Sequence, residues 1–271
     1  MRMSNPWKAC NLYQNLLESL PPGLVARVPA GHSRLLAWQQ ESRHYYQTMY
    51  LDEAQGVPAL KRPGDAVCRE CEKFHLSTLK QIDKNPDIDL GNELEAVFEA
   101  YFQQVLDTLV PGLVIERADQ QELHMPDFQV RHVRTGEVLL LMEFKVIFRP
   151  FLLISKKVNP AYECYSHSMT LDVAGKLNAQ RELVVNGPGA HKCAYVYWYD
   201  LPCVKGVFWM SAEDVYRHQD EQVAYKRKVV SGDMGSAGQV RGAVRKLYLP
   251  LYQMNDFDSL ISLLQERVPL K

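Results

Sequence analysis

The sequence of 271 residues lacks the features that define several large classes of protein. No stretch approaches the roughly 18 consecutive apolar residues that a membrane-spanning helix needs, and no apolar run follows a basic start. A membrane span and a secretory signal peptide are therefore not expected. The six cysteines are scattered along the chain, which favours reduced thiols and a cytoplasmic location over a disulfide framework.

An excess of charge of one sign is also missing. The formal net charge is -1 and the pI is about 6.7, so a nucleic-acid partner would have to bind a local basic patch. The spaced glycines of residues 232–238 fit neither a phosphate-binding P-loop nor a dinucleotide fingerprint. Cys68, Cys71 and His75 have the spacing of zinc ligands, but no second Cys-x-x-Cys completes a structural site. We therefore expect no stoichiometric zinc.

What the sequence does contain is a change of pattern near residue 90. Residues 1–88 predict a mainly helical N-terminal region with polar breaks, the last of them the segment DKNPDIDLGN. Residues 89–271 then predict a helix from Asn92, three strands, a helix at about 170–185 and two strands. A helix opened by Ser211, a basic segment at 226–246, a strand and a last helix follow. With 46% apolar residues the chain can bury a sizeable core, and this order predicts an α/β fold.

The segment MPDFQVRHVRTGEVLLLMEFKV, residues 125–146, predicts two β-strands around a tight turn. A three-residue loop at 134–136, with Gly136 in the left-handed conformation, would pair residues whose numbers sum to 270. This register sets Asp127 opposite Glu143, and directly opposite residues share a face of the sheet. Lys145 lies two residues beyond Glu143 and therefore points the same way.

Two carboxylates side by side in an apolar sheet repel each other and are costly to desolvate. A divalent cation removes that cost, and Mg²⁺ typically takes one or two protein carboxylates while keeping water and substrate phosphate in its other positions. The carbonyl of Phe144 is a candidate third oxygen. A nearby ammonium such as Lys145 would orient a water or offset developing charge. The alternative is an edge hairpin whose charges form a solvated ion pair, although the apolar run VLLLM before Glu143 favours a buried central strand.

At these residues the sequence resembles the PD-(D/E)XK nuclease superfamily, over about residues 91–210. Pro126-Asp127 supplies the first half of the motif and Glu143-Phe144-Lys145 the second, with fifteen residues between the carboxylates. The resemblance implies a restriction-endonuclease-like core, a mixed β-sheet flanked by helices, and Mg²⁺ with Mn²⁺ as a substitute. It also implies a glutamate on the preceding helix, for which Glu95 is the better match and Glu93 the reserve. Gln180 lies where some branches carry a glutamine; a surface or capping role is its alternative.

The resemblance implies DNA as the substrate and makes two basic segments candidates for contact with the DNA backbone. These are Lys156 with Lys157, and the run Lys226, Arg227 and Lys228; a solvated surface loop is the alternative for the second. The chain is thus predicted to be a Mg²⁺-dependent deoxyribonuclease, an endonuclease of restriction, defence, mobile-element, recombination or repair systems. A non-cleaving nucleic-acid-binding module and an RNA-directed nuclease remain alternatives. Double-strand cutting by one site per chain would suggest a homodimer.

Overall fold

The computed structural model describes residues 12–13, 15–25, 84–119, 124–147, 169–200, 205–221, 225–228, 243–249 and 253–268. Cys68, Cys71, His75, Lys156 and Lys157 lie outside these ranges, as does most of the predicted N-terminal region. Across the described ranges, none of the helices combines the length and the apolar character that crossing a membrane requires.

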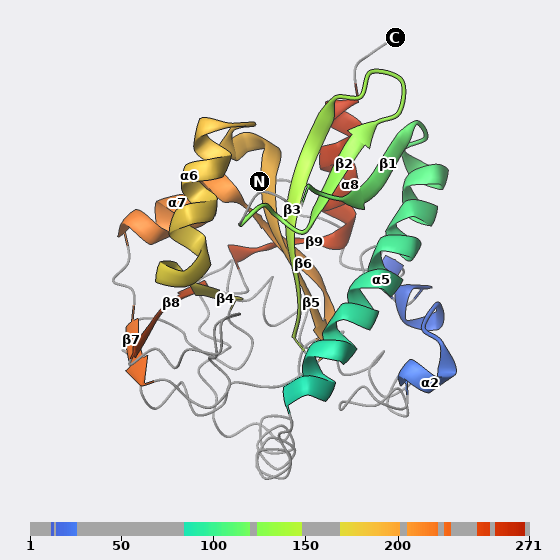
Figure 1. Ribbon diagram of the computed structural model, residues 1–271. Coiled ribbons are helices and arrows are strands. Elements are labelled where there is room, and N and C mark those ends of the chain that lie inside the picture. The colour runs from blue at the N-terminus through green and yellow to red at the C-terminus, as the bar shows by residue number, and fades with distance from the viewer. Residues whose placement is uncertain are drawn as a thin grey trace.

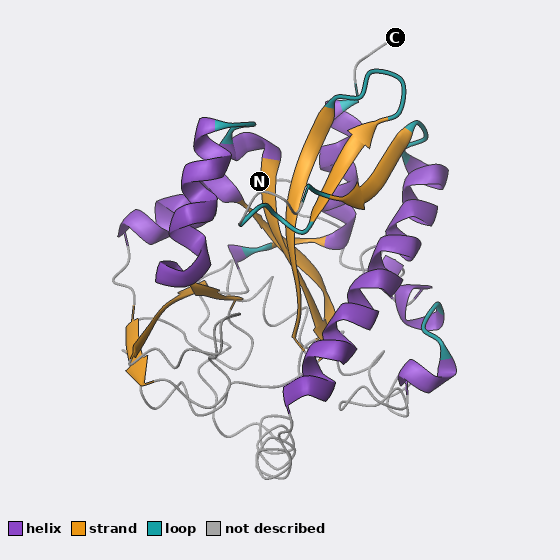
Figure 2. Cartoon of the chain, viewed as in Figure 1, coloured by secondary structure: helices purple, strands orange, loops and turns teal. Residues whose placement is uncertain are grey.

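A mixed six-stranded sheet forms the centre of the structure (Figures 1 and 2). Its strands run in the spatial order β1-β2-β3-β5-β6-β9, and β3 and β5 pair in parallel while every other neighbouring pair is antiparallel. This arrangement confirms the predicted α/β class and the predicted central position of the VLLLM strand. The bounds are Leu113–Arg117 (β1), Phe128–His132 (β2), Val138–Ile147 (β3), Cys193–Asp200 (β5), Lys205–Ser211 (β6) and Asn255–Asp256 (β9).

Helices cover both faces of this sheet. Helices α5 (Lys84–Leu109) and α8 (Phe257–Arg267) pack on one face, while α6 (Asn178–Asn186) and α7 (Ala212–Glu221) pack on the other (Figure 1). The smaller helical elements are α2 (Pro22–Val25), a π-helical turn η4 (Val173–Leu177) and a 3₁₀ turn η5 (Ala190–Lys192). The sheet therefore separates two hydrophobic clusters, and the buried residues of β5 and β6 alternate between them along each strand.

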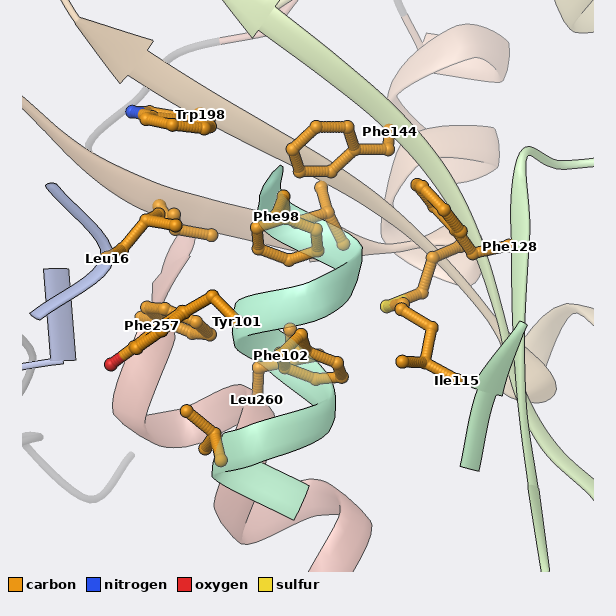
Figure 3. Packing of buried hydrophobic residues seen from close by; sticks show 14 of the residues in the cluster. Leu16, Phe98, Tyr101, Phe102, Ile115, Phe128, Phe144, Trp198, Phe257 and Leu260 are labelled. Carbon is orange, nitrogen blue, oxygen red and sulfur yellow. The ribbon is translucent and has the colours of Figure 1, made fainter. Parts of the chain in front are cut away.

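An aromatic cluster fills the space between α5 and the sheet (Figure 3). The ring of Phe98 stacks on that of Phe144 with centroids 4.2 Å apart and on that of Phe102 at 5.3 Å. Phe128 meets Phe144 edge-on at 5.8 Å. Because side chains alternate along a strand, the burial of Phe144 against α5 turns Glu143 to the opposite face, which α6 covers.

The predicted helix break at residues 83–92 is wrong. DKNPDIDLGN was expected to separate two helices, but α5 begins at Lys84 and runs through this segment to Leu109. Pro86 is tolerated because it lies in the first turn, where its missing N–H has no partner within the helix. Gly91 is accommodated inside the helix at a modest loss of helix propensity.

A second correction concerns the segment before α6. The helix expected from about residue 170 begins only at Val173, because Met169–Asp172 forms strand β4. This strand belongs to a separate antiparallel sheet of order β4-β8-β7, with β8 at Ala243–Leu249 and β7 at Tyr225–Lys228. Tyr197 of the main sheet donates a hydrogen bond to the Thr170 carbonyl at 3.2 Å, which ties the two sheets together. Pairing with distant strands thus overrides the local helical pattern.

The hairpin has the predicted register at the end that carries Asp127 and Glu143, but its loop differs from the predicted one. Phe128 pairs with Met142 and Val130 with Leu140, so the residue numbers sum to 270 as predicted. The loop has four residues, 133–136, because the His132 carbonyl accepts from the Gly136 N–H and the His132 N–H donates to the Glu137 carbonyl, both at 2.9 Å. A register shift between Val130 and Arg131 compensates for the longer loop. Gly136 adopts the expected positive φ, 71°.

Candidate metal centre

Asp127 and Glu143 lie on neighbouring chain segments at the end of the hairpin furthest from its loop. Asp127 directly precedes β2, and its Oδ2 accepts a hydrogen bond of 2.8 Å from the N–H of Phe144 in β3. Glu143 is buried, with 8% of its surface exposed. The bond to Phe144 therefore fixes the Asp127 carboxylate against the strand residue that follows Glu143, so the structure brings the two predicted carboxylates together.

A lysine that the sequence did not single out lies between them. The Nζ atom of Lys176, in η4, is 2.5 Å from Oε1 of Glu143 and 3.9 Å from Oδ1 of Asp127. One positive charge thus contacts both carboxylates. The spacing from Gln180 is the signal that could have identified Lys176, since residues four apart on a helix share a face. That signal depended on knowing that Gln180 points into the site.

Gln180 does point into the site, which rules out the surface role. Its amide donates to Oε2 of Glu143 at 2.8 Å and to the carbonyl of His124 at 3.3 Å, and only 1% of its surface is exposed. His124 has a φ of 74°, which is uncommon for a residue other than glycine. Such backbone strain gathers at functional sites. Gln180 therefore links Glu143 to the strained loop that leads into Asp127.

The surroundings of Glu143 perturb its ionisation. Burial raises the pKa of the Glu143 carboxyl above its ordinary value, and repulsion from Asp127 raises it further. The ammonium of Lys176 and the amide of Gln180 act in the opposite sense. Carboxyls perturbed by burial and by specific charged partners cluster at functional sites.

Lys145 follows on the same strand and keeps access to solvent. The surrounding protein desolvates its ammonium and, together with the nearby charge of Lys246, lowers the pKa of Lys145 to about 8. Among the residues that the structure describes, Lys145 forms no ion pair, whereas Lys176 binds Glu143 and Lys246 lies 3.7 Å from Asp172. Its charge is thus available to a ligand.

Glu95 lies on α5 near the site but is directed elsewhere. Its Oε2 accepts from Arg117 at 2.9 Å. Burial is the main cause of the raised pKa of Glu95, and the charges of Asp127 and Lys176 also act on it. The helix therefore carries a glutamate into electrostatic range of the centre, as expected, but with an arginine as its partner. The reserve candidate, Glu93, is exposed.

The donor set fits an ion that uses few protein ligands. No group of three or more His, Cys, Asp or Glu side chains suited to metal binding occurs within the described ranges. Asp127 and Glu143 already share one cation, the ammonium of Lys176. The carbonyl of Phe144 lies on the same edge of β3 as its N–H, which contacts Asp127. Two carboxylates and one carbonyl match the sparse protein coordination of Mg²⁺.

The predicted DNA contacts are only partly within the described residues. Lys226, Arg227 and Lys228 belong to β7, at one edge of the small sheet. The backbone of these three residues therefore forms a β-strand and not a surface loop.

Comparison with protein-family models, with curated proteins and with solved structures gives no match for this chain.

Proposed function

We propose that this protein is a metal-dependent nuclease of the PD-(D/E)XK type, with a restriction-endonuclease-like core, that hydrolyses DNA phosphodiester bonds. One observation carries the proposal. Asp127 and Glu143 converge on a single cation position at the end of a buried hairpin, and Lys145 lies on the same strand as Glu143. Two carboxylates side by side in a hydrophobic sheet are costly to desolvate, and a bound cation offsets that cost.

Each residue has a role that its position supports. Asp127, Glu143 and the carbonyl of Phe144 would hold Mg²⁺, which when bound would polarise a phosphoryl oxygen and lower the pKa of a bound water. With a pKa of about 8, Lys145 is mainly a cation at neutral pH and can bind the oxygen on which negative charge develops. Gln180 holds the Glu143 carboxylate in place through its amide. Glu95 could bind the water or the metal only after its hydrogen bond to Arg117 is broken.

The surrounding fold supports the same proposal. The hairpin forms the centre of a mixed sheet, a long helix carries Glu95 toward it, and a second helix carries Gln180 into it from the opposite face. These are the elements that the resemblance to the nuclease superfamily led us to expect around the motif.

A second candidate function is a nucleic-acid-binding module of the same fold that does not cleave. The specific observation in its favour is that Lys176 and Gln180 already satisfy both oxygens of Glu143. The carboxylate pair can therefore persist in the folded protein without a metal ion.

Nicking of supercoiled plasmid separates the two candidates. We expect the purified protein to convert supercoiled plasmid to nicked or linear forms with Mg²⁺ or Mn²⁺ and to leave it intact in EDTA. Lys192→Ala is a matched control, because Lys192 pairs with Glu137 at 2.9 Å, near the opposite end of β3. This variant should cleave plasmid like the parent. Binding of DNA without any metal-dependent nicking would favour the module. Cleavage of RNA but not of plasmid would favour an RNA-directed nuclease.

A further inference from the structure

Lys176 occupies a position that the proposed chemistry reserves for a metal ion. Its Nζ atom is 2.5 Å from one oxygen of Glu143 and 3.9 Å from one oxygen of Asp127. We propose that Lys176 is an internal counter-ion, which holds the cation position of the metal-free protein and which a divalent ion must displace. This inference rests on the proposed function, because it concerns the metal site of that function.

The distances do not allow both cations to occupy the position together. Mg²⁺ binds carboxylate oxygens at about 2.0–2.1 Å. An ammonium at 2.5 Å from Oε1 of Glu143 fills the space in front of the same oxygen. The two positive charges would also repel strongly at such a separation. Metal binding therefore requires that the Lys176 ammonium leave Oε1 of Glu143.

The two sides of this contact differ in their freedom to move. The Lys176 side chain is 40% exposed, whereas that of Glu143 is 11% exposed. A displaced ammonium thus reaches water with little further reorganisation, and long lysine side chains readily extend their charge into solvent. The carboxylates stay in place because Gln180 holds Glu143 and the Phe144 N–H holds Asp127. The result is a fixed pair of anions with an exchangeable cation.

The backbone of Lys176 is itself held by the small sheet. Asp172, the last residue of β4, accepts a hydrogen bond from the Gly175 N–H at 2.9 Å and so caps the π-helical turn. Lys246 of β8 lies 3.7 Å from the same carboxylate. Single π-helical turns are frequent at functional sites. The turn positions the base of the lysine while its ammonium remains free to exchange.

A purely structural ion pair makes a different prediction. If Lys176 only stabilises the fold, its replacement leaves metal affinity unchanged or lowers it by loosening the site. If it competes with the metal, removal of its charge raises metal affinity. Loss of one unit of competing positive charge should tighten binding by about tenfold or more, where tenfold corresponds to about 1.4 kcal/mol.

The test is a titration of the full-length protein with Mn²⁺, in which free Mn²⁺ is followed by electron paramagnetic resonance and no DNA is present. We compare the parent, Lys176→Met and the control Lys192→Met, whose lysine pairs with Glu137 away from the site. Lys176→Met should bind Mn²⁺ about tenfold or more tightly than the parent, and Lys192→Met should bind like the parent. Equal or weaker binding by Lys176→Met overturns the proposal, as does absence of Mn²⁺ binding from both the parent and this variant.

Thermal unfolding provides a second readout. Without metal, Lys176→Met should melt at a lower temperature than the parent, and Mn²⁺ should raise its melting temperature by a larger increment than it raises that of the parent. An equal or smaller increment counts against the proposal. If Lys176→Met is insoluble with and without Mn²⁺, Lys176→Gln takes its place under the same criteria, because it keeps a hydrogen-bond donor for Glu143.

Failure of this inference is distinguishable from failure of the proposed function. A parent that nicks plasmid with Mg²⁺, together with a Lys176→Met variant of unchanged Mn²⁺ affinity, refutes the counter-ion and leaves the nuclease. Tighter Mn²⁺ binding by the variant, with no cleavage by the parent, supports the counter-ion and refutes the nuclease.

Discussion

Replacement of Gln180 by methionine tests whether the Gln180 amide stabilises the buried Glu143 carboxylate beside Asp127. Methionine has a similar volume, so the change removes the amide without leaving a large cavity. Because Gln180 is only 1% exposed, water cannot easily replace the lost donor. Two hydrogen bonds disappear, one to the ionised Glu143 at 2.8 Å and one to the His124 carbonyl at 3.3 Å.

The magnitude follows from these two bonds. A hydrogen bond to a charged group contributes about 1.5–3 kcal/mol and a neutral one about 0.5–1.5 kcal/mol. We therefore expect Gln180→Met to lower the free energy of unfolding by about 2–4.5 kcal/mol at neutral pH. Gln219 is a matched control, because it bonds to Arg181 and Asn178 at the protein surface, and Gln219→Met should change stability by less than about 0.5 kcal/mol.

The pH dependence of this loss identifies Glu143 as its origin. The folded pKa of Glu143 is raised above the ordinary value of 4.5, so the folded protein holds this proton more tightly than the unfolded chain. Ionisation of Glu143 therefore lowers stability as the pH rises from 4.5 through the folded pKa. Without Gln180 that pKa rises further, so the deficit of the variant is largest at neutral pH and shrinks in acid.

Urea unfolding in EDTA, followed by the fluorescence of the buried tryptophans, measures both quantities. We would compare the parent, Gln180→Met and Gln219→Met at about pH 7.5 and about pH 5. A Gln180→Met variant as stable as the parent at the higher pH refutes the assigned bonds. A deficit of the same size at both values shows that Glu143 is not the group concerned.

Two further predictions concern the site and the hairpin. Asp127→Asn should lose Mn²⁺ binding and cleavage. Its DNA binding, measured by fluorescence anisotropy, should stay equal or tighten, because a negative charge facing phosphate is removed. Weaker DNA binding would contradict this prediction. Gly136→Ala should lower the free energy of unfolding by about 1–2 kcal/mol, since its φ of 71° disfavours any side chain, although no atom lies within 4 Å of the added Cβ. Gly91→Ala, inside α5 and equally unobstructed, should instead raise it by about 0.5–1 kcal/mol, and equal effects at both glycines would contradict the conformational explanation.

The sequence predicted those elements whose signals are local. Helix α7 begins where Ser211 precedes an acid three residues on. The Asp214 N–H donates to the Ser211 hydroxyl at 3.1 Å, which is the expected N-terminal cap, and that hydroxyl in turn donates to the Asp214 carboxylate at 2.7 Å. The strands around β3 were predictable because their apolar runs have the length and composition of buried strands. Gly136 marked the turn because its left-handed conformation suits glycine.

Other features depended on contacts that no local pattern encodes. Strand β4 exists because Met169–Asp172 pairs with β8, more than seventy residues away in the sequence. The hairpin register was predicted correctly from a loop that is one residue too short, and the irregularity at Val130 compensates for it. Lys176 escaped notice because only the fold brings η4 against Glu143.

The direct test of the central claim is the single-turnover cleavage rate of Lys145→Ala with saturating DNA and Mg²⁺. Lys145 is exposed, forms no ion pair among the described residues and lies on the face of β3 that carries Glu143, so its loss should leave folding and DNA affinity nearly unchanged. If its ammonium stabilises charge in the transition state, the rate should fall by about 10²–10³-fold. A Lys145→Ala variant that cleaves at the rate of the parent would contradict the catalytic site proposed here.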